Sequence, residues 1–200
     1  MSVVAARVYE DVIIMSADSI MCNGWSKSTN NDFVKINAIN EMVLGGCGTA
    51  EEMSLMWHYM NTHKPTNATE KEVLNFIIEF SKWKKDLTGD GCVDNVYPLI
   101  YDRHLFKIQN MFVYEINNYC AIGAGEDFSN TALHLGHSPI KAVKVACDLC
   151  CFVSEPIIEY VIHKETGLVK KEKYTKQKWV VSSDDSNKQV TDLTTYHFEN

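Results

Sequence analysis

The sequence predicts an α+β fold: a four-layer αββα sandwich in which two antiparallel sheets face each other and a helix pair covers each outer side. Two observations predict it. Strand-like hydrophobic segments alternate with pairs of amphipathic helices along the chain. Each helix pair lies between groups of strands that can form hairpins, whereas a parallel βαβ fold would place single helices between single strands. The order therefore favours two packed sheets.

The chain begins directly with a predicted strand. Residues 3–6 are Val-Val-Ala-Ala, and residues 12–15 are Val-Ile-Ile-Met after a two-residue acidic turn. A polar, turn-rich stretch then predicts a loop. The segments 33–39 and 41–48 predict a further strand pair, which ends in the glycines of the sequence LGGCG.

Two amphipathic helices are predicted next. Thr49 with Glu52, and Thr69 with Glu72, match the capping box that often begins a helix. Apolar residues then recur at helical spacing after each box, which predicts one buried face per helix. In the first helix these residues are Met53, Met56, Trp57 and Met60.

The second half repeats the order of strands followed by two helices. A helix is predicted at 127–135, and Pro139 begins the next one, because proline is favoured in the first helical turn. A last strand or hairpin is predicted at 156–169. The strand-like segments before these helices are 96–102, 104–109 and 112–125.

One domain accounts for most of the chain. Its 200 residues suffice to bury a sizeable core. Hydrophobic residues make up 46% and charged residues 22%, as in ordinary globular proteins. We predict a domain over residues 1–165 and a peripheral extension over 166–200, which is polar, weakly patterned and carries one candidate strand at 178–181.

Charge and hydropathy exclude several classes of function. The net charge of −7 argues against a nucleic-acid binder, which would carry a basic face. No apolar run approaches the roughly 20 residues that span a bilayer, and the N-terminus has no signal-peptide pattern, so we expect a cytoplasmic protein that does not bind membranes. In that compartment the seven cysteines are expected to be free thiols.

The N-terminus is the first candidate for chemistry. Methionine at position 1 is usually removed when the next side chain is small, as Ser2 is. Removal would leave Ser2 with a hydroxyl and a free α-amine whose ordinary pKa is about 7.7–8.0, suited to a general base. A hydroxyl with a base on the same residue is a known way to activate a weak nucleophile.

Such a nucleophile needs a nearby cation, a carboxylate to hold that cation, and backbone N–H groups to bind an oxyanion. Asp18 at the end of the second strand, Lys35 on the third, and the glycine turn before the first helix are candidates. Taken singly, each has an ordinary structural explanation as a turn residue, an edge charge or a tight turn.

Together these features resemble the proteasome β-subunit family of N-terminal-nucleophile hydrolases, and within it the bacterial HslV-type peptidases. The resemblance rests on the N-terminal nucleophile, ADS after the second strand, VKI on the third and LGGCGTAEE before the first helix. It continues at AIGAGEDFSNTAL, similar to the family's IGSGG turn, and at ACDLCCFVS, similar to the end of its fourth helix. It extends from Ser2 to about Ile162.

The resemblance implies peptide-bond hydrolysis through an acyl-enzyme ester on Ser2. Lys35 would be the cation that tunes Ser2, and Asp18 would orient Lys35. The oxyanion donor would be a backbone N–H of the glycine turn, from Gly48 or, as the alternative, Gly45. The implied partners are a peptide or unfolded-protein substrate, further copies of the chain in a homo-oligomeric ring, and an ATP-dependent unfoldase.

The resemblance also implies a substrate pocket and a cation site. No cofactor is required, but backbone carbonyls near the end of the fourth helix could hold a structural monovalent cation such as Na⁺. The pocket residues would be Met21, Phe33, Gly46 and Ala50. The carbonyls would belong to Cys147, Cys150 and Val153.

Two residues depart from the family pattern and keep alternatives open. Ser2 stands where the family usually has Thr, and Ala124 replaces the serine of its GSG sequence. The alternatives are a catalytically inactive ring subunit or scaffold with the same fold, and an amidase that acts on small amides. A zinc site is disfavoured, because the Cys147-x-x-Cys150-Cys151 group lacks a second pair at comparable spacing.

Overall fold

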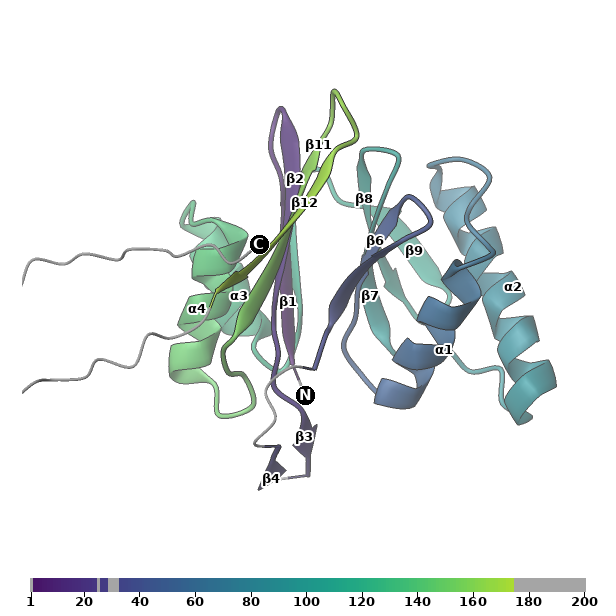
Figure 1. Ribbon diagram of the computed structural model, residues 1–200, viewed down its shortest axis with the longest axis horizontal. Helices are drawn as coiled ribbons and strands as arrows, with labels where there is room; N and C mark the ends of the chain where they lie inside the picture. Colours follow the sequence, from purple (N-terminus) through teal and green to yellow (C-terminus); the bar gives the residue numbers. More distant parts are fainter. Residues whose placement is uncertain (1, 25, 29–32, 175–200) are drawn as a thin grey trace, which may run out of the picture.

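A computed structural model describes residues 2–24, 26–28 and 33–174. Within them, two five-stranded antiparallel sheets lie face to face, and two helices cover the outer face of each sheet (Figure 1). The predicted four-layer αββα sandwich is confirmed.

The first sheet has the strand order β10-β1-β2-β11-β12. β1 is central and pairs antiparallel with both β10 and β2, with Val3 opposite Gly123 and Val4 opposite Ala17. Its first four residues are fully buried, because one face meets the second sheet and the other meets helices. The strands are β1 (Val3–Val8), β2 (Val12–Asp18), β10 (Tyr119–Gly123), β11 (Ile157–His163) and β12 (Val169–Tyr174).

The second sheet has the strand order β5-β6-β7-β8-β9 and consists of consecutive antiparallel neighbours. A single bridge between Cys47 and Val96 continues the β6–β7 pairing beyond the end of β6. The strands are β5 (Ile36–Ile39), β6 (Met42–Gly45), β7 (Val96–Tyr101), β8 (His104–Gln109) and β9 (Phe112–Glu115).

The four described helices are those that the sequence predicts: α1 (Ala50–Met60), α2 (Glu70–Thr88), α3 (Glu126–His134) and α4 (Pro139–Leu149). One detail of the prediction is wrong. The Thr49 hydroxyl does accept a hydrogen bond from the Glu52 N–H, at 3.4 Å, but the Glu52 side chain does not complete the capping box. It instead accepts hydrogen bonds from the backbone of Asp94 and Asn95.

Apolar side chains fill three separate layers. One cluster lies between the second sheet and the pair α1 and α2, one between the two sheets, and one between the first sheet and the pair α3 and α4. The two sheets therefore share a core, and residues at the ends of their strands can meet across it.

Three further observations concern loops and ends. The predicted loop after β2 contains a short strand pair, β3 (Cys22–Asn23) and β4 (Ser26–Lys27). β12 lies at the edge of the first sheet and follows the predicted domain end at residue 165, so residues 169–174 of the predicted extension pair with the domain. The candidate strand at 178–181 lies outside the described residues. No described helix is long and apolar enough to cross a membrane.

Candidate active site

Ser2 lies immediately before the central strand β1, and the peptide group that joins it to Val3 is hydrogen-bonded at both its C=O and its N–H. Its carbonyl accepts a hydrogen bond from the Gly125 N–H at 3.3 Å, and the next amide, that of Val3, donates to Asp18 Oδ1 at 2.9 Å. Ser2 is 6% exposed. The backbone next to the predicted nucleophile is therefore held by contacts to two other segments.

Asp18 and Lys35 form an ion pair, here called the inner pair. Lys35 Nζ lies 2.8 Å from both carboxylate oxygens of Asp18, and the two side chains are 2% and 0% exposed. Asp18 ends β2 in the first sheet, and Lys35 precedes β5 in the second. The pair thus joins the two sheets at the end of the sandwich where the chain begins (Figure 1).

Asp18 also binds backbone amides from three segments. The N–H groups of Val3, Ile20 and Ser154 donate to its carboxylate at 2.9, 3.3 and 3.4 Å. A buried charge is tolerated when it is paired and hydrogen-bonded, as here. Because the same carboxylate binds the amide next to Ser2 and the ammonium of Lys35, it fixes both residues relative to each other.

The glycine turn supplies a backbone amide that is available to a ligand. The Gly46 N–H donates to the Lys35 carbonyl at 3.1 Å, that of Cys47 to the Val96 carbonyl at 3.0 Å, and that of Thr49 to a side-chain oxygen at 2.6 Å. Among the described residues, the Gly48 N–H has no acceptor, and Gly48 is exposed. This amide could therefore bind an oxyanion.

The alternative donor, Gly45, is less well placed. A Cβ added to Gly45 would lie 2.8 Å from Val4 Cγ1 and 3.0 Å from the sulfur of Met15, so this residue faces the core between the sheets. Gly48 is in contrast part of the cavity that Ser2 lines. The geometry favours Gly48 over Gly45.

A cavity of about 380 Å³ opens beside Ser2. Gly123 in its wall has a φ of +95°, and a Cβ there would lie 2.4 Å from the Ser2 carbonyl oxygen, so a side chain would clash. The wall comes from five separate parts of the chain, and most of its residues are not among those predicted for the site. Besides Ser2, the lining residues are Cys47, Gly48, Val96, Lys107, Gln109, Gly123, Ala124 and Glu126.

Cys47 lines the same cavity, and its thiol is a second candidate nucleophile. Burial raises the pKa of the Cys47 thiol to about 12, although the nearby Lys35 charge acts in the opposite direction. The thiol donates a weak hydrogen bond to the Ile122 carbonyl at 3.7 Å. Because the thiolate is the reactive form of cysteine, Cys47 is protonated and unreactive near neutral pH.

The four residues predicted for the substrate pocket are not among those that line this cavity. Met21 is 41% exposed just before β3, and Ala50 begins α1. The Phe33 N–H donates to the Ser19 carbonyl at 3.3 Å, and a Cβ on Gly46 would clash with Met53 in the α1 layer. Their role in a pocket stays a prediction.

The predicted cation site follows α4. The Cys150 carbonyl already accepts a hydrogen bond from the Val153 N–H at 3.2 Å, and the Val153 side chain is buried in the α3–α4 core. A carbonyl oxygen has two lone pairs, so this hydrogen bond leaves one for a cation, and the three-carbonyl site stays a prediction. Among the described residues, no group of three or more His, Cys, Asp or Glu side chains could hold a metal ion, and all seven cysteines are free thiols.

The fold is that of the proteasome-like peptidases. Neither a protein-family model nor a curated protein sequence matches the chain. Among solved structures, it is similar to BPH of Thiobacillus denitrificans in complex with epoxomicin, with a TM-score of 0.71 and 15% identity over 80% of this chain and 98% of that chain. BPH of the same organism in a second structure gives a TM-score of 0.69 at 16% identity, covering 80% of this chain and 97% of that one. HslV from Trypanosoma brucei gives 0.63 at 18% identity, covering 80% and 99%.

Proposed function

We propose that the protein is an N-terminal-nucleophile peptidase that hydrolyses peptide bonds through an ester on Ser2. The observation that carries the proposal is the joint position of three groups: Ser2 at the start of β1, the inner pair that binds the adjacent amide, and the Gly48 N–H across the same cavity. The similarity in fold to HslV and BPH supports it.

The proposed reaction requires cleavage of the peptide bond before Ser2, which frees its α-amine. The amine then accepts the proton of the Ser2 hydroxyl as the oxygen attacks the substrate carbonyl. The positive charge of Lys35 favours the deprotonated hydroxyl and lowers the pKa of the amine. The Gly48 N–H donates to the oxyanion that forms.

Breakdown of the intermediate releases the new amino terminus of the substrate, which takes the proton from the α-amine. The acyl group stays on the Ser2 oxygen as an ester. The same amine, again unprotonated, then accepts a proton from a water molecule that attacks the ester. It returns this proton to the Ser2 oxygen as the ester C–O bond breaks and the carboxylic acid product leaves. No step uses a metal ion.

The proposed setting is a cytoplasmic homo-oligomeric ring whose chamber holds the nucleophiles, with an unfolded polypeptide as substrate. An ATP-dependent unfoldase would control entry to this chamber. These expectations rest on the resemblance to HslV-type peptidases and on the fold.

A second candidate is a catalytically inactive ring subunit or scaffold. Ala124 favours it, because this residue lines the cavity beside Ser2 and has no hydroxyl to hydrogen-bond near the α-amine. A small-amide amidase is a third alternative, and it would need no ring.

The first test is the intact mass of the protein after expression in a cytosol, followed by cleavage of fluorogenic peptides. We expect a mass that lacks one methionine, and activity that Ser2→Ala abolishes while the particle size in light scattering is unchanged. Ser54→Ala, on the exposed face of α1, is the matched control and should keep full activity. Retention of Met1, or undiminished cleavage by Ser2→Ala, would overturn the proposal.

The same measurements separate the alternatives. A ring that retains Met1 and cleaves nothing supports the scaffold. A monomer or dimer that hydrolyses small amides but no peptides supports the amidase.

A further inference from the structure

The Asn95 side-chain amide makes two hydrogen bonds to Thr49, the residue that follows the glycine turn. Its Oδ1 accepts a hydrogen bond from the Thr49 N–H at 2.6 Å, and its Nδ2 donates to the Thr49 carbonyl at 2.9 Å. Asn95 is fully buried and directly precedes β7. The Asn95 side chain thus binds both the N–H and the carbonyl of Thr49.

This contact lies next to the amide that the proposed reaction needs. Cys47 and Val96 exchange two backbone hydrogen bonds of 3.0 and 2.9 Å, and Asn95 holds Thr49 on the other side of Gly48. Gly48 itself has a φ of +148°, and a Cβ there would lie 1.8 Å from Asn95 Oδ1. The orientation of the Gly48 peptide is therefore set from both sides by residues 95 and 96.

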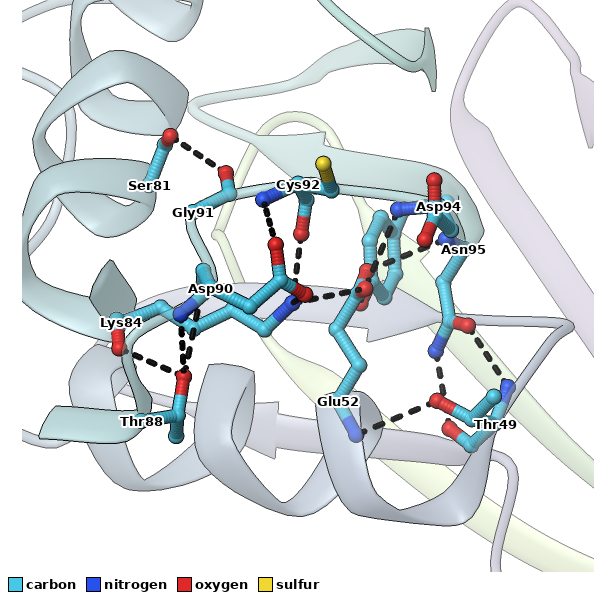
Figure 2. Close-up of polar contacts among 11 residues, drawn as sticks. Thr49, Glu52, Ser81, Lys84, Thr88, Asp90, Gly91, Cys92, Asp94 and Asn95 are labelled. Atoms are coloured by element: carbon cyan, nitrogen blue, oxygen red, sulfur yellow. Dashed lines mark hydrogen bonds and ion pairs between the residues drawn. The ribbon is translucent and has the colours of Figure 1, made fainter.

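Asn95 is in turn fixed by a buried carboxylate. Glu52 Oε1 accepts hydrogen bonds from the Asn95 N–H at 3.0 Å and from the Tyr97 hydroxyl at 2.8 Å, while Oε2 accepts from the Asp94 N–H at 3.0 Å. Figure 2 shows Glu52 on the first turn of α1 pointing toward this loop. These contacts leave the Asn95 backbone little freedom to rotate.

Lys84 completes the group, here called the outer cluster: Glu52, Lys84, Asp90 and Asn95. Its ammonium lies 3.6 Å from Glu52 and 3.2 Å from Asp90, and it donates to the Cys92 carbonyl at 2.5 Å. Figure 2 shows these contacts running from α2 across the loop to Thr49. The cluster connects the end of α2 to the glycine turn.

We propose that Asn95 is a positioning residue of the reaction, which holds the Gly48 N–H in the orientation that binds the oxyanion. This inference rests on the proposed function. Asn95 does not line the cavity and so acts through the turn, not on the substrate. Its loss should weaken binding of the transition state more than binding of the substrate.

The kinetic test uses Asn95→Ala, which removes both side-chain hydrogen bonds. A shift of about 1 Å in a catalytic group can cost about 100-fold in rate, so we expect kcat to fall about 100-fold with KM nearly unchanged. A peptide boronate, whose tetrahedral adduct with Ser2 resembles the intermediate, should bind about 100-fold more weakly. A merely structural role would lower the number of active molecules without changing the affinity of the boronate.

A second measurement needs no activity. The Thr49 amide should exchange its hydrogen at least tenfold faster in Asn95→Ala than in the parent protein, because its acceptor is gone. Asn75→Ala, which removes an exposed asparagine side chain from α2, is the matched control and should change neither exchange nor kinetics. If Asn95→Ala does not fold, Asn95→Ser can make at most one of the two contacts and should shift both readouts in the same direction.

The outcomes separate the two proposals. An unchanged hydrogen-exchange rate at the Thr49 amide would contradict the hydrogen bond from Thr49 to the Asn95 side chain, whether or not the protein is a peptidase. Faster exchange with an unchanged kcat and boronate affinity would make Asn95 structural only and overturn the positioning role. A parent protein that cleaves no peptide and binds no boronate would overturn the proposed function, and the positioning role with it.

Discussion

The inner pair and the outer cluster both place a lysine ammonium among carboxylates inside the protein, but they hold it differently. In the inner pair, Lys35 is bound by both oxygens of one carboxylate at 2.8 Å, with both side chains almost fully buried. In the outer cluster, Lys84 lies 3.6 Å from Glu52 and also binds Asp90 and a backbone carbonyl.

The difference lies in what each carboxylate binds besides the lysine. Asp18 binds the amide next to Ser2, so the inner pair brings a positive charge near the proposed nucleophile. Glu52 instead binds two loop amides and a tyrosine hydroxyl, so the outer cluster fixes the shape of the backbone. In the proposed reaction, the first arrangement would supply charge and the second would fix the backbone geometry.

The largest expected effect separates these two roles. Lys35→Ala should lower kcat/KM by about 1000-fold or more, because a positioned charge and base contribute on that scale. Lys84→Ala should lower it less than tenfold, since Glu52 keeps its hydrogen bonds from the loop. Peptide cleavage assays measure both, and light scattering checks that assembly is intact. Full activity in Lys35→Ala would contradict the role of the inner pair.

Cysteine labelling gives a second contrast. With a pKa of about 12 against an ordinary 9.0, Cys47 should react with iodoacetamide at pH 8 about 1000-fold more slowly than an unperturbed thiol. The labelling rate of Cys47 should rise about tenfold per pH unit up to pH 11, because its thiolate fraction rises about tenfold per pH unit below the pKa. Lys35→Ala should slow it further, since the lysine charge lowers this pKa. Mass spectrometry of the labelled peptide measures the rate, and labelling of Cys47 as fast as exposed Cys151 would contradict its burial.

Stability should differ between the clusters as well. Asp18→Asn leaves Lys35 buried without its carboxylate, which should cost about 3–5 kcal/mol in the free energy of unfolding. Glu52→Gln should cost about 2 kcal/mol, because one acceptor oxygen remains and Lys84 retains Asp90 and Cys92 as partners. Urea unfolding at pH 7 measures both. Equal losses in the free energy of unfolding would show that Asp90 does not stabilise the Lys84 charge when the Glu52 carboxylate is gone.

The sequence predicted the fold and the inner pair for identifiable reasons. Strand and helix segments are periodic over enough residues to be recognised locally, and both Asp18 and Lys35 lie at strand ends within a short, motif-rich stretch. The face-to-face packing of the two sheets then brings these two strand ends together. The Ser2, Asp18, Lys35 and Gly48 set was predicted because these residues, in this order and with their flanking motifs, resemble the proteasome β-subunit family; its catalytic role stays a prediction.

The contacts of the outer cluster could not be predicted from local sequence patterns. Asn95 meets Thr49 only through the β6–β7 register, which no local pattern fixes across 46 residues of separation. Glu52 was assigned to a capping box because its spacing from Thr49 fits one, yet buried loop amides in the folded protein are better partners for its side chain. Tertiary hydrogen bonds overrode a local preference.

A third buried carboxylate provides the reference for the smallest effect. Glu159 in β11 is 6% exposed and accepts hydrogen bonds from the Ser16 and Tyr174 hydroxyls, at 2.5 and 3.3 Å. Burial raises the pKa of Glu159 above its ordinary 4.5, and these hydrogen bonds oppose the rise without cancelling it. The hydroxyl donors thus do not offset the effect of burial on the Glu159 pKa.

The sign of the resulting pH dependence follows from this pKa. The folded state holds the Glu159 proton more tightly than the unfolded state, so the contribution of Glu159 to stability is complete below pH 4.5 and is lost as the pH rises through the raised pKa. Glu159→Gln cannot ionise. The stability of this variant relative to the parent should therefore increase between pH 4 and pH 8, as measured by urea unfolding at each pH. A stability difference that stays constant over this range would mean that burial does not raise the pKa of Glu159 in the folded protein.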